Sequence, residues 1–152
     1  MKLVRSARSL IAPVAIVVIL VDQITKTLAE NNLKTHSIHL LGPLSLQLIY
    51  NSGIAFSIGS GNAALATVIE IVVILGLIYY TRRINSRTLA VGFGLVIGGA
   101  LGNICDRIFR HNNGAVIDFI HTGFWPTFNL ADSAVVIGIV VILLGSRSRT
   151  QD

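Results

Sequence analysis

The residues with the clearest chemical potential are two carboxylates, Asp118 and Asp132, in a chain that carries few charges. Only 12% of its 152 residues are charged, 53% are hydrophobic, and the mean hydropathy is +0.74. Ionisable groups at a membrane boundary are costly, so they indicate a functional site and require a partner. Two carboxylates a few ångströms apart cannot both ionise, so one can serve as general acid while the other activates water. We therefore treat Asp118 and Asp132 as a candidate catalytic pair.

Each carboxylate also has to be explained by its place in the sequence. Asp132 begins an apolar run that continues to Gly145, and Asn129 precedes it at the spacing of a capping box. The helix dipole also favours a carboxylate at this position. Capping is therefore a sufficient explanation for Asp132, but it does not explain Asp118, which lies among aromatic residues. Residue chemistry alone leaves both interpretations open.

The composition predicts a small multi-pass membrane protein made of one domain, residues 1–152. Four apolar stretches are each near the ~20 residues that a bilayer requires. They are 9–28, 62–81, 88–107 and 130–146. By the positive-inside rule, both termini and the loop 82–87 are cytoplasmic, because most basic residues fall on one side. These are Lys2, Arg5, Arg8, Arg82, Arg83, Arg87, Arg147 and Arg149. This topology explains the net charge of +5 without nucleic acid.

The first stretch could instead be a cleavable signal peptide, because a basic start precedes its apolar core. No convincing cleavage site follows, and the polar residues after Val21 favour a retained span. The segments 29–61 and 108–129 are then external. Residues 44–50 largely alternate apolar and polar side chains after a Gly-Pro turn signal, which predicts a small β-sheet on the outer membrane surface. The aromatic segment 109–128 suits the membrane interface.

Polar residues of three predicted helices are expected to converge on one layer. With a rise of about 1.5 Å per residue, Asp22 lies about 21 Å beyond Arg8, and Asp132 lies about 22 Å from Arg147. Asp106, on the third helix, lies about 28 Å beyond Arg87, which is nearer the outer boundary of a hydrocarbon core about 30 Å thick. We infer that a site lies in this outward-facing layer.

The polar residues on the first and third helices have structural interpretations beside functional ones. Asp22 and Lys26 share a helix face. They predict either an ion pair with Lys26 extended towards the surface, or a structural support or substrate-backbone contact at the site. Asn103, Asp106 and Arg107 share the outer end of the third helix. A membrane-buried Arg107 needs an anion, which Asp106 or Asp22 could supply.

Two further stretches predict local structure around the site. Asn51, Ser52 and Gly53 join the predicted sheet to the second span as a turn, and Asn51 could equally bond a substrate backbone. Small residues recur at every fourth position of the third span, which predicts close packing against another helix. They are Ala90, Gly94, Gly98 and Gly102.

Other chemistries are less well supported. There is no His-Glu-x-x-His zinc motif and no activated-serine motif, and the single cysteine, Cys105, excludes an internal disulfide. Glu70 lies in the middle of the second span, which predicts either a proton or cation path or a neutral group hydrogen-bonded to another helix. A transporter relay would step its carboxylates across the membrane, whereas Asp22 and Asp132 are expected at one face. A non-catalytic lipid-binding protein is the other alternative.

Five short motifs together resemble those of the bacterial lipoprotein signal peptidases (signal peptidase II), a family of integral membrane aspartic proteases. Each motif is weak alone, but they follow one another in order through nearly the whole chain. The termini, the loop 82–87 and parts of 29–50 carry no motif, and Glu70 has no counterpart in the pattern. The motifs are Asp22-Gln-Ile-Thr-Lys26, Asn51-Ser-Gly-Ile-Ala-Phe-Ser57, Gly98-Gly-Ala-Leu-Gly-Asn-Ile-Cys-Asp-Arg107, Val116-Ile-Asp-Phe119 and Phe128-Asn-Leu-Ala-Asp132.

The resemblance implies an all-α membrane protein with four transmembrane helices and a small external β-subdomain, working as an aspartic endopeptidase. Asp118 and Asp132 are then the catalytic pair. Other residues hold substrate or organise the pair: Asn51, Gly53, Asn103, Arg107 and Asn129, with Asp22, Lys26 and Asp106 in supporting contacts.

The implied substrate is a prolipoprotein, cleaved before a diacylglyceryl-modified cysteine at the external face of the bacterial cytoplasmic (inner) membrane. The layer of polar residues agrees with this, because a cysteine that bears two acyl chains is held near the membrane surface. We expect lipid-modified precursors and membrane phospholipids as partners and a monomeric protein. We expect no nucleic-acid partner and no metal or organic cofactor.

Overall fold

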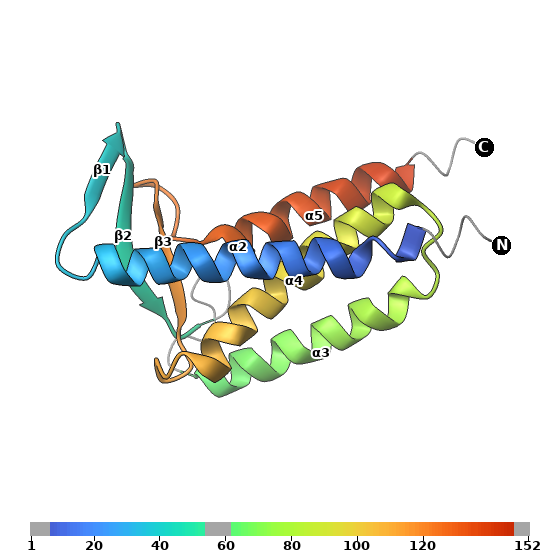
Figure 1. The fold of residues 1–152 in the computed structure, drawn as a ribbon, viewed down its shortest axis with the longest axis horizontal. Helices are drawn as coiled ribbons and strands as arrows, with labels where there is room; N and C mark the ends of the chain where they lie inside the picture. The colour runs from blue at the N-terminus through green and yellow to red at the C-terminus, as the bar shows by residue number, and fades with distance from the viewer. Residues whose placement is uncertain (1–6, 54–61, 148–152) are drawn as a thin grey trace.

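The computed structural model describes residues 7–53 and 62–147, in which a bundle of four long helices carries a three-stranded sheet at one end (Figure 1). The helices are α2 (Ile11–Asn32), α3 (Ala63–Thr81), α4 (Arg87–Phe109) and α5 (Leu130–Arg147). The strands are β1 (Ile38–Leu41), β2 (Leu44–Asn51) and β3 (Val116–His121). Residues 54–57, the second half of the motif that begins at Asn51, lie outside the described residues.

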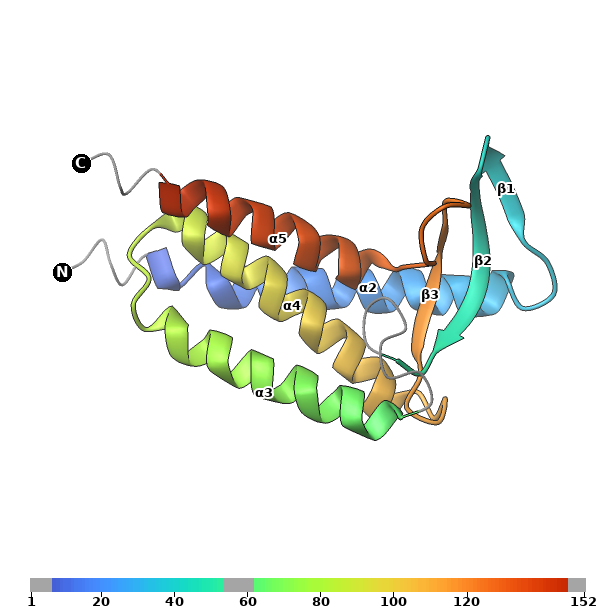
Figure 2. The same cartoon turned by 180° about the vertical axis from the view of Figure 1, so that it is seen from behind.

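The helices agree closely with the predicted spans. Three of them, α2, α3 and α4, are long and apolar enough to cross a membrane. α5 is also apolar, but its apolar part, Leu130–Ser146, is shorter. The turn between α3 and α4 lies at the end of the bundle opposite the sheet, where α2 begins and α5 ends (Figures 1 and 2). The polar ends of α2 and α4 and the start of α5 therefore all lie next to the sheet.

The first helix is longer than predicted. It ends at Asn32, four residues beyond the predicted limit of 28. The extra turn is stabilised by packing, because Ala29 and Leu33 form a buried cluster with Ile117 and Phe119 of β3. Hydropathy could not predict this, since the cluster pairs segments distant in the sequence.

α4 is the central helix, and its glycines allow two neighbours to approach closely. A Cβ atom added at Gly98 would lie 2.8 Å from the Ala15 Cα atom of α2. One added at Gly99 would lie 2.4 Å from the Ala131 carbonyl oxygen of α5. The predicted small-residue face is confirmed as the surface against α2. The second face, against α5, was not predicted.

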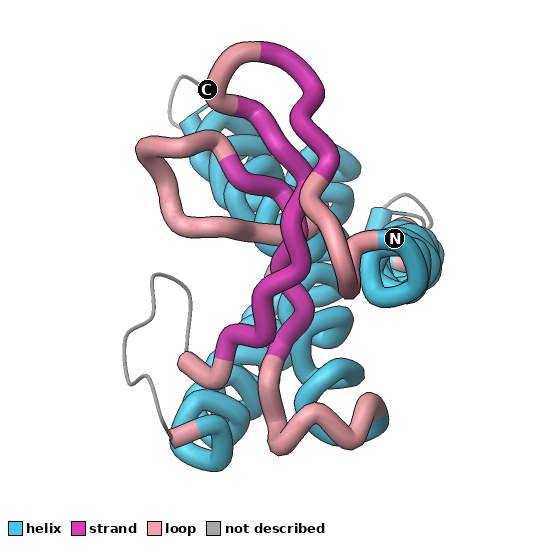
Figure 3. The backbone as a smooth tube through the Cα atoms, turned by 90° about the vertical axis from the view of Figure 1, so that its left-hand side faces the viewer, coloured by secondary structure: helices cyan, strands magenta, loops and turns pink. Residues whose placement is uncertain are grey.

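The sheet is antiparallel with the strand order β1-β2-β3, and it crosses the end of the bundle (Figure 3). β2 confirms the strand predicted at 44–50, but β3 was not predicted. Asp118 of β3 pairs with Ile49, and Asn51 pairs with Val116. On its other edge, β3 exchanges backbone hydrogen bonds with Phe128. β3 therefore connects the end of the sheet to the start of α5.

Candidate active site

Asp118 lies on β3, with its side chain turned into the protein. It is 2% exposed, and its two oxygens accept hydrogen bonds from Asn51 Nδ2 at 3.0 Å and Asn129 Nδ2 at 2.7 Å. Burial, and then the charge of Asp132, raise the pKa of Asp118 from 3.8 to about 7, although both hydrogen bonds act in the opposite direction. Asp118 can therefore hold a proton near neutral pH.

Asp132 lies in the first turn of α5 and forms the predicted capping box. Its backbone N–H donates to Asn129 Oδ1 at 2.9 Å, and its Oδ2 accepts from the Asn129 backbone N–H at 3.3 Å. Its Oδ1 accepts from Asn103 Nδ2 at 2.9 Å. Capping and a role at the site prove compatible, because the same Asn129 side chain also donates to Asp118. Asn129 thus joins the two carboxylates.

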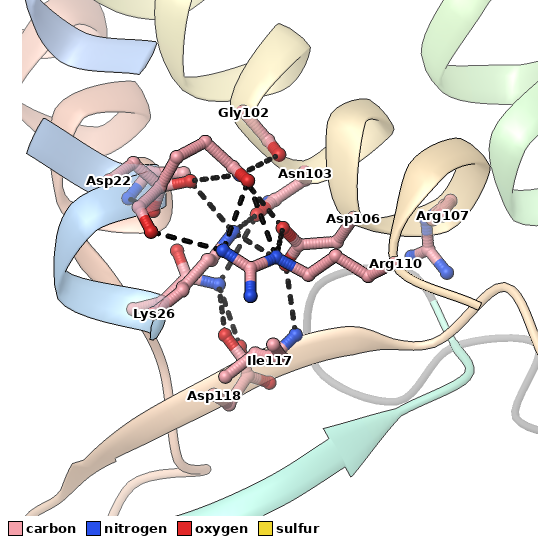
Figure 4. A network of polar contacts seen from close by, with 12 residues as sticks. Asp22, Lys26, Gly102, Asn103, Asp106, Arg107, Arg110, Ile117 and Asp118 are labelled. Carbon is pink, nitrogen blue, oxygen red and sulfur yellow. Dashed lines mark hydrogen bonds and ion pairs between the residues drawn. The ribbon is translucent and has the colours of Figure 1, made fainter. Parts of the chain in front are cut away.

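Lys26 lies at the centre of a buried charge network (Figure 4). Its Nζ atom lies 2.8 Å from both Asp22 and Asp106, and it donates to Asn103 Oδ1 at 2.9 Å. The ion pair with Asp22 confirms the predicted pair. The expectation that Lys26 extends towards the surface is wrong, since its side chain is fully buried. Its ammonium group is retained inside because three acceptors surround it.

The two acidic partners of Lys26 connect the helices to the rest of the site. Asp22 Oδ1 accepts from the Ala131 backbone N–H at 3.0 Å and so holds the first turn of α5. Asp106 Oδ2 accepts from the Ile117 backbone N–H at 3.0 Å and so holds β3. Asp22 and Asp106 therefore fix the elements that carry Asp132 and Asp118.

Arg107 has a different anionic partner from the one predicted. Its guanidinium contacts Glu70 through Nε at 3.2 Å and Nη2 at 3.3 Å, rather than Asp106 or Asp22. It also donates to the carbonyl oxygens of Gly53 and Gly114, the latter at 2.8 Å. The prediction was wrong because Asp22 and Asp106 are both occupied by Lys26.

Glu70 bonds another helix, which is one of the two interpretations that the sequence left open for it. Its position in the middle of a span was a sufficient signal that it needed a partner. Its partner could not be identified, however, because helix-rise arithmetic places Glu70 and Arg107 at different levels.

A cavity of about 1050 Å³ opens beside this network. Both carboxylates line it, together with Asn51, Gly53, Glu70, Asn103 and Arg107. Asn129, Asp22, Lys26 and Asp106 do not line the cavity and support it from behind. Much of the remaining wall is apolar and comes from the segment before α5 and from α5 itself: Phe124, Trp125, Pro126, Phe128, Val135, Val136 and Ile139. A peptide with apolar groups could therefore reach both carboxylates.

Comparison with solved structures identifies the class of protein. Two solved bacterial membrane enzymes share this fold. One has a TM-score of 0.80 and 30% identity and covers 90% of this chain and 87% of its own. The other has a TM-score of 0.75 and 31% identity and covers 87% and 88%. The fold is thus that of a multi-pass bacterial membrane enzyme.

Sequence comparison identifies the family. The family model described as signal peptidase (SPase) II matches residues 14–147. The lipoprotein signal peptidase of Rhodococcus jostii is 40% identical over 142 residues, 90% of this chain and 72% of the relative. That of Mycobacterium leprae is 38% identical over 140 residues, 89% of this chain and 70% of the relative. The chain belongs to the signal peptidase II family, aspartic peptidases that remove signal peptides from prolipoproteins. The predicted family and activity are confirmed.

Proposed function

We propose that Asp118 and Asp132 are the two aspartates that carry out peptide hydrolysis. The observation that supports this best is their shared connection through Asn129, which donates to Asp118 and caps the helix turn of Asp132. Asn51 donates to the Oδ2 atom of Asp118, and Asn103 donates to the Oδ1 atom of Asp132. Both carboxylates line the same cavity of about 1050 Å³.

The two carboxylates would divide the work of a general acid and a general base. Asp118 holds the shared proton, because its pKa is raised to about 7. Asp132 acts as the general base, with the helix N-terminus and two N–H donors facing its carboxylate. It removes a proton from a water molecule, whose oxygen attacks the carbonyl carbon of the scissile peptide bond.

The proton on Asp118 then passes to the carbonyl oxygen and gives a neutral tetrahedral intermediate. When this intermediate collapses, the C–N bond breaks and the nitrogen takes the proton that Asp132 received from water. Asp118 recovers its own proton from the intermediate. Three asparagine side chains hold the carboxylates in position throughout. Asn51 and Asn129 donate to Asp118, and Asn103 donates to Asp132.

The apolar wall of the cavity supports a lipid-modified substrate. Val135, Val136 and Ile139 follow Asp132 along α5 and line the same cavity. A peptide whose cysteine bears a diacylglyceryl group could therefore place its acyl chains along α5 while the bond before the cysteine meets the carboxylates. We propose that cleavage occurs there.

We also propose that the sheet end of the molecule faces outwards from the bacterial cytoplasmic membrane. The opposite end carries Arg82, Arg83 and Arg87, which the positive-inside rule assigns to the cytoplasm. The sheet then lies at the external surface of the cytoplasmic membrane. The chain works as a monomer surrounded by phospholipids, because one copy supplies every residue of the proposed site.

The test is cleavage of a lipidated precursor by the purified protein. We expect Asp118→Asn and Asp132→Asn each to lower the rate of signal-peptide release by a factor on the order of 10⁴, which abolishes detectable cleavage. The helical content should stay unchanged. Ser133→Ala, which changes a neighbouring cavity-lining residue, is the matched control and should stay active. We expect no loss with a metal chelator. Cleavage that survives either aspartate change would contradict the assignment, and loss with the chelator would indicate a metal-dependent mechanism.

A further inference from the structure

Glu70 is the only charged residue of α3, and neither the family motifs nor the proposed mechanism uses it. Its side chain is 15% exposed and lines the cavity that contains both carboxylates. A carboxylate in the middle of an apolar helix is costly unless it serves a purpose. Its position therefore calls for an explanation at the level of the site.

Among the described residues, the hydrogen bonds of Glu70 are all with one guanidinium group. Its Oε2 accepts from Arg107 Nε at 3.2 Å and its Oε1 from Arg107 Nη2 at 3.3 Å. This two-point contact matches the planar fork of an arginine, so it fixes the orientation of the group as well as its position. Since α3 packs mainly on α4, the pair also ties these two helices together (Figure 2).

The orientation of Arg107 determines the position of a loop. With Glu70 on one side of the guanidinium, Nη2 reaches the Gly53 carbonyl oxygen and Nη1 reaches that of Gly114 at 2.8 Å. Gly53 follows β2, and Gly114 precedes β3. Arg107 thus holds the ends of the two paired strands that carry Asn51 and Asp118.

The loop in turn sets the direction of an amide that bonds the active site. The Gly53 backbone N–H donates to Asn51 Oδ1 at 2.9 Å, so the Nδ2 group of Asn51 has to point the other way. Nδ2 donates to Asp118 Oδ2 at 3.0 Å. A continuous series of contacts therefore runs from Glu70 through Arg107, Gly53 and Asn51 to Asp118.

We propose that Glu70 is a positioning residue for peptide cleavage, which orients Arg107 and through it the Asn51 amide that bonds Asp118. The inference rests on the proposed roles of the aspartates. It explains why an apolar helix retains one carboxylate at the level of the cavity.

The test compares Glu70→Gln with the wild-type protein in the lipidated-precursor assay. Glutamine has the same size but only one acceptor oxygen, so it cannot hold both guanidinium nitrogens. We expect kcat to fall about 10- to 100-fold, as for a small displacement of catalytic groups, with a smaller change in KM. Glu70→Asp is too short for both contacts, so kcat should fall. Because it retains the charge, this loss in kcat should be smaller than that of Glu70→Gln.

Glu30→Gln is the matched control. Glu30 also pairs with an arginine, Arg110 at 2.6 Å, near the same end of the bundle. Glu30 accepts from the Tyr50 hydroxyl and Arg110 contacts Asp106, but among the described residues neither Glu30 nor Arg110 bonds Asn51 or Asp118. Its kcat should stay close to that of the wild-type protein. An equal loss in Glu30→Gln would mean that any broken Glu–Arg pair has this effect and would overturn the inference.

A double-mutant cycle with Asn51→Ala separates positioning from general damage. If Glu70 acts through Asn51, Glu70→Gln should change kcat by less than about twofold in the Asn51→Ala background. The same fold-loss in both backgrounds, or an unchanged kcat in the wild-type background, would overturn the inference. Asp118→Asn in the same assay tests the catalytic pair independently. Loss there with no effect of Glu70→Gln refutes the positioning role alone, and retained cleavage in Asp118→Asn refutes the catalytic pair.

Discussion

The raised pKa of Asp118 should make the stability of the folded protein depend on pH. A buried carboxyl whose pKa is about 7 when folded and 3.8 when unfolded binds its proton more tightly in the folded state. The free energy of unfolding must therefore fall as pH rises from about 4 to about 7, and the loss is complete above that range. Its full size is about 4 kcal/mol, from about 1.4 kcal/mol for each pKa unit.

Replacing Asp118 by Asn removes this titration and keeps the size of the side chain. The new amide places an N–H₂ group against a donor from Asn51 or Asn129, which costs stability, but this cost is the same at every pH. The comparison of two pH values therefore isolates the titration. The stability of Asp118→Asn relative to the wild-type protein should be about 2–3 kcal/mol more favourable at pH 8 than at pH 5.

Thermal unfolding in detergent micelles at the two pH values measures this difference. For a chain of this length, about 2–3 kcal/mol corresponds to a relative shift in Tm of roughly 5–10 °C. Ser133→Ala changes a cavity-lining side chain that does not titrate, so its Tm difference from wild type should be the same at both pH values. An equal Tm difference for Asp118→Asn at both pH values would refute a raised pKa at this residue.

Two further predictions concern the support of the site. Lys26→Met leaves buried Asp22 without its cation and leaves Asp106 with Arg110 alone, so it should lower the free energy of unfolding by about 3–5 kcal/mol in detergent. A loss below about 1 kcal/mol would show that the network is not a buried ion cluster. Gly99→Ala places a Cβ atom 2.4 Å from the Ala131 carbonyl oxygen, whereas Gly76→Ala meets nothing within 4 Å. Gly99→Ala should therefore cost about 1–3 kcal/mol and reduce cleavage, and Gly76→Ala should do neither; equal effects would contradict close packing of α4 on α5.

The positions of the helices could be predicted because they depend on local composition. A bilayer requires about 20 apolar residues per span, and the four apolar stretches near this length match the observed helices closely. The small residues of α4 likewise have a strict spacing that predicts a packing face. The capping box at Asn129 and Asp132 is also local, since its donors and acceptors lie within one helical turn. These features need no knowledge of the rest of the chain.

β3 was missed because its strand character comes from its neighbours. Its buried residues read as part of an aromatic segment, but they pair with β2 on one edge and with Phe128 on the other. The extra turn of α2 has the same origin, since it packs against Ile117 and Phe119. Both features depend on contacts between segments far apart in the sequence, which no single stretch records.

The sequence by itself determined that Asp118 and Asp132 were the carboxylates to explain, because charge is rare in this chain. Only the tertiary structure decided which group each polar side chain meets. Lys26 takes both Asp22 and Asp106, which leaves Arg107 to Glu70. Helix-rise arithmetic could not find that pair, because α4 crosses the bundle obliquely and a long arginine side chain reaches across the difference in level (Figure 2). Spacing along one helix predicts depth, but the partner of a charge depends on how the helices cross.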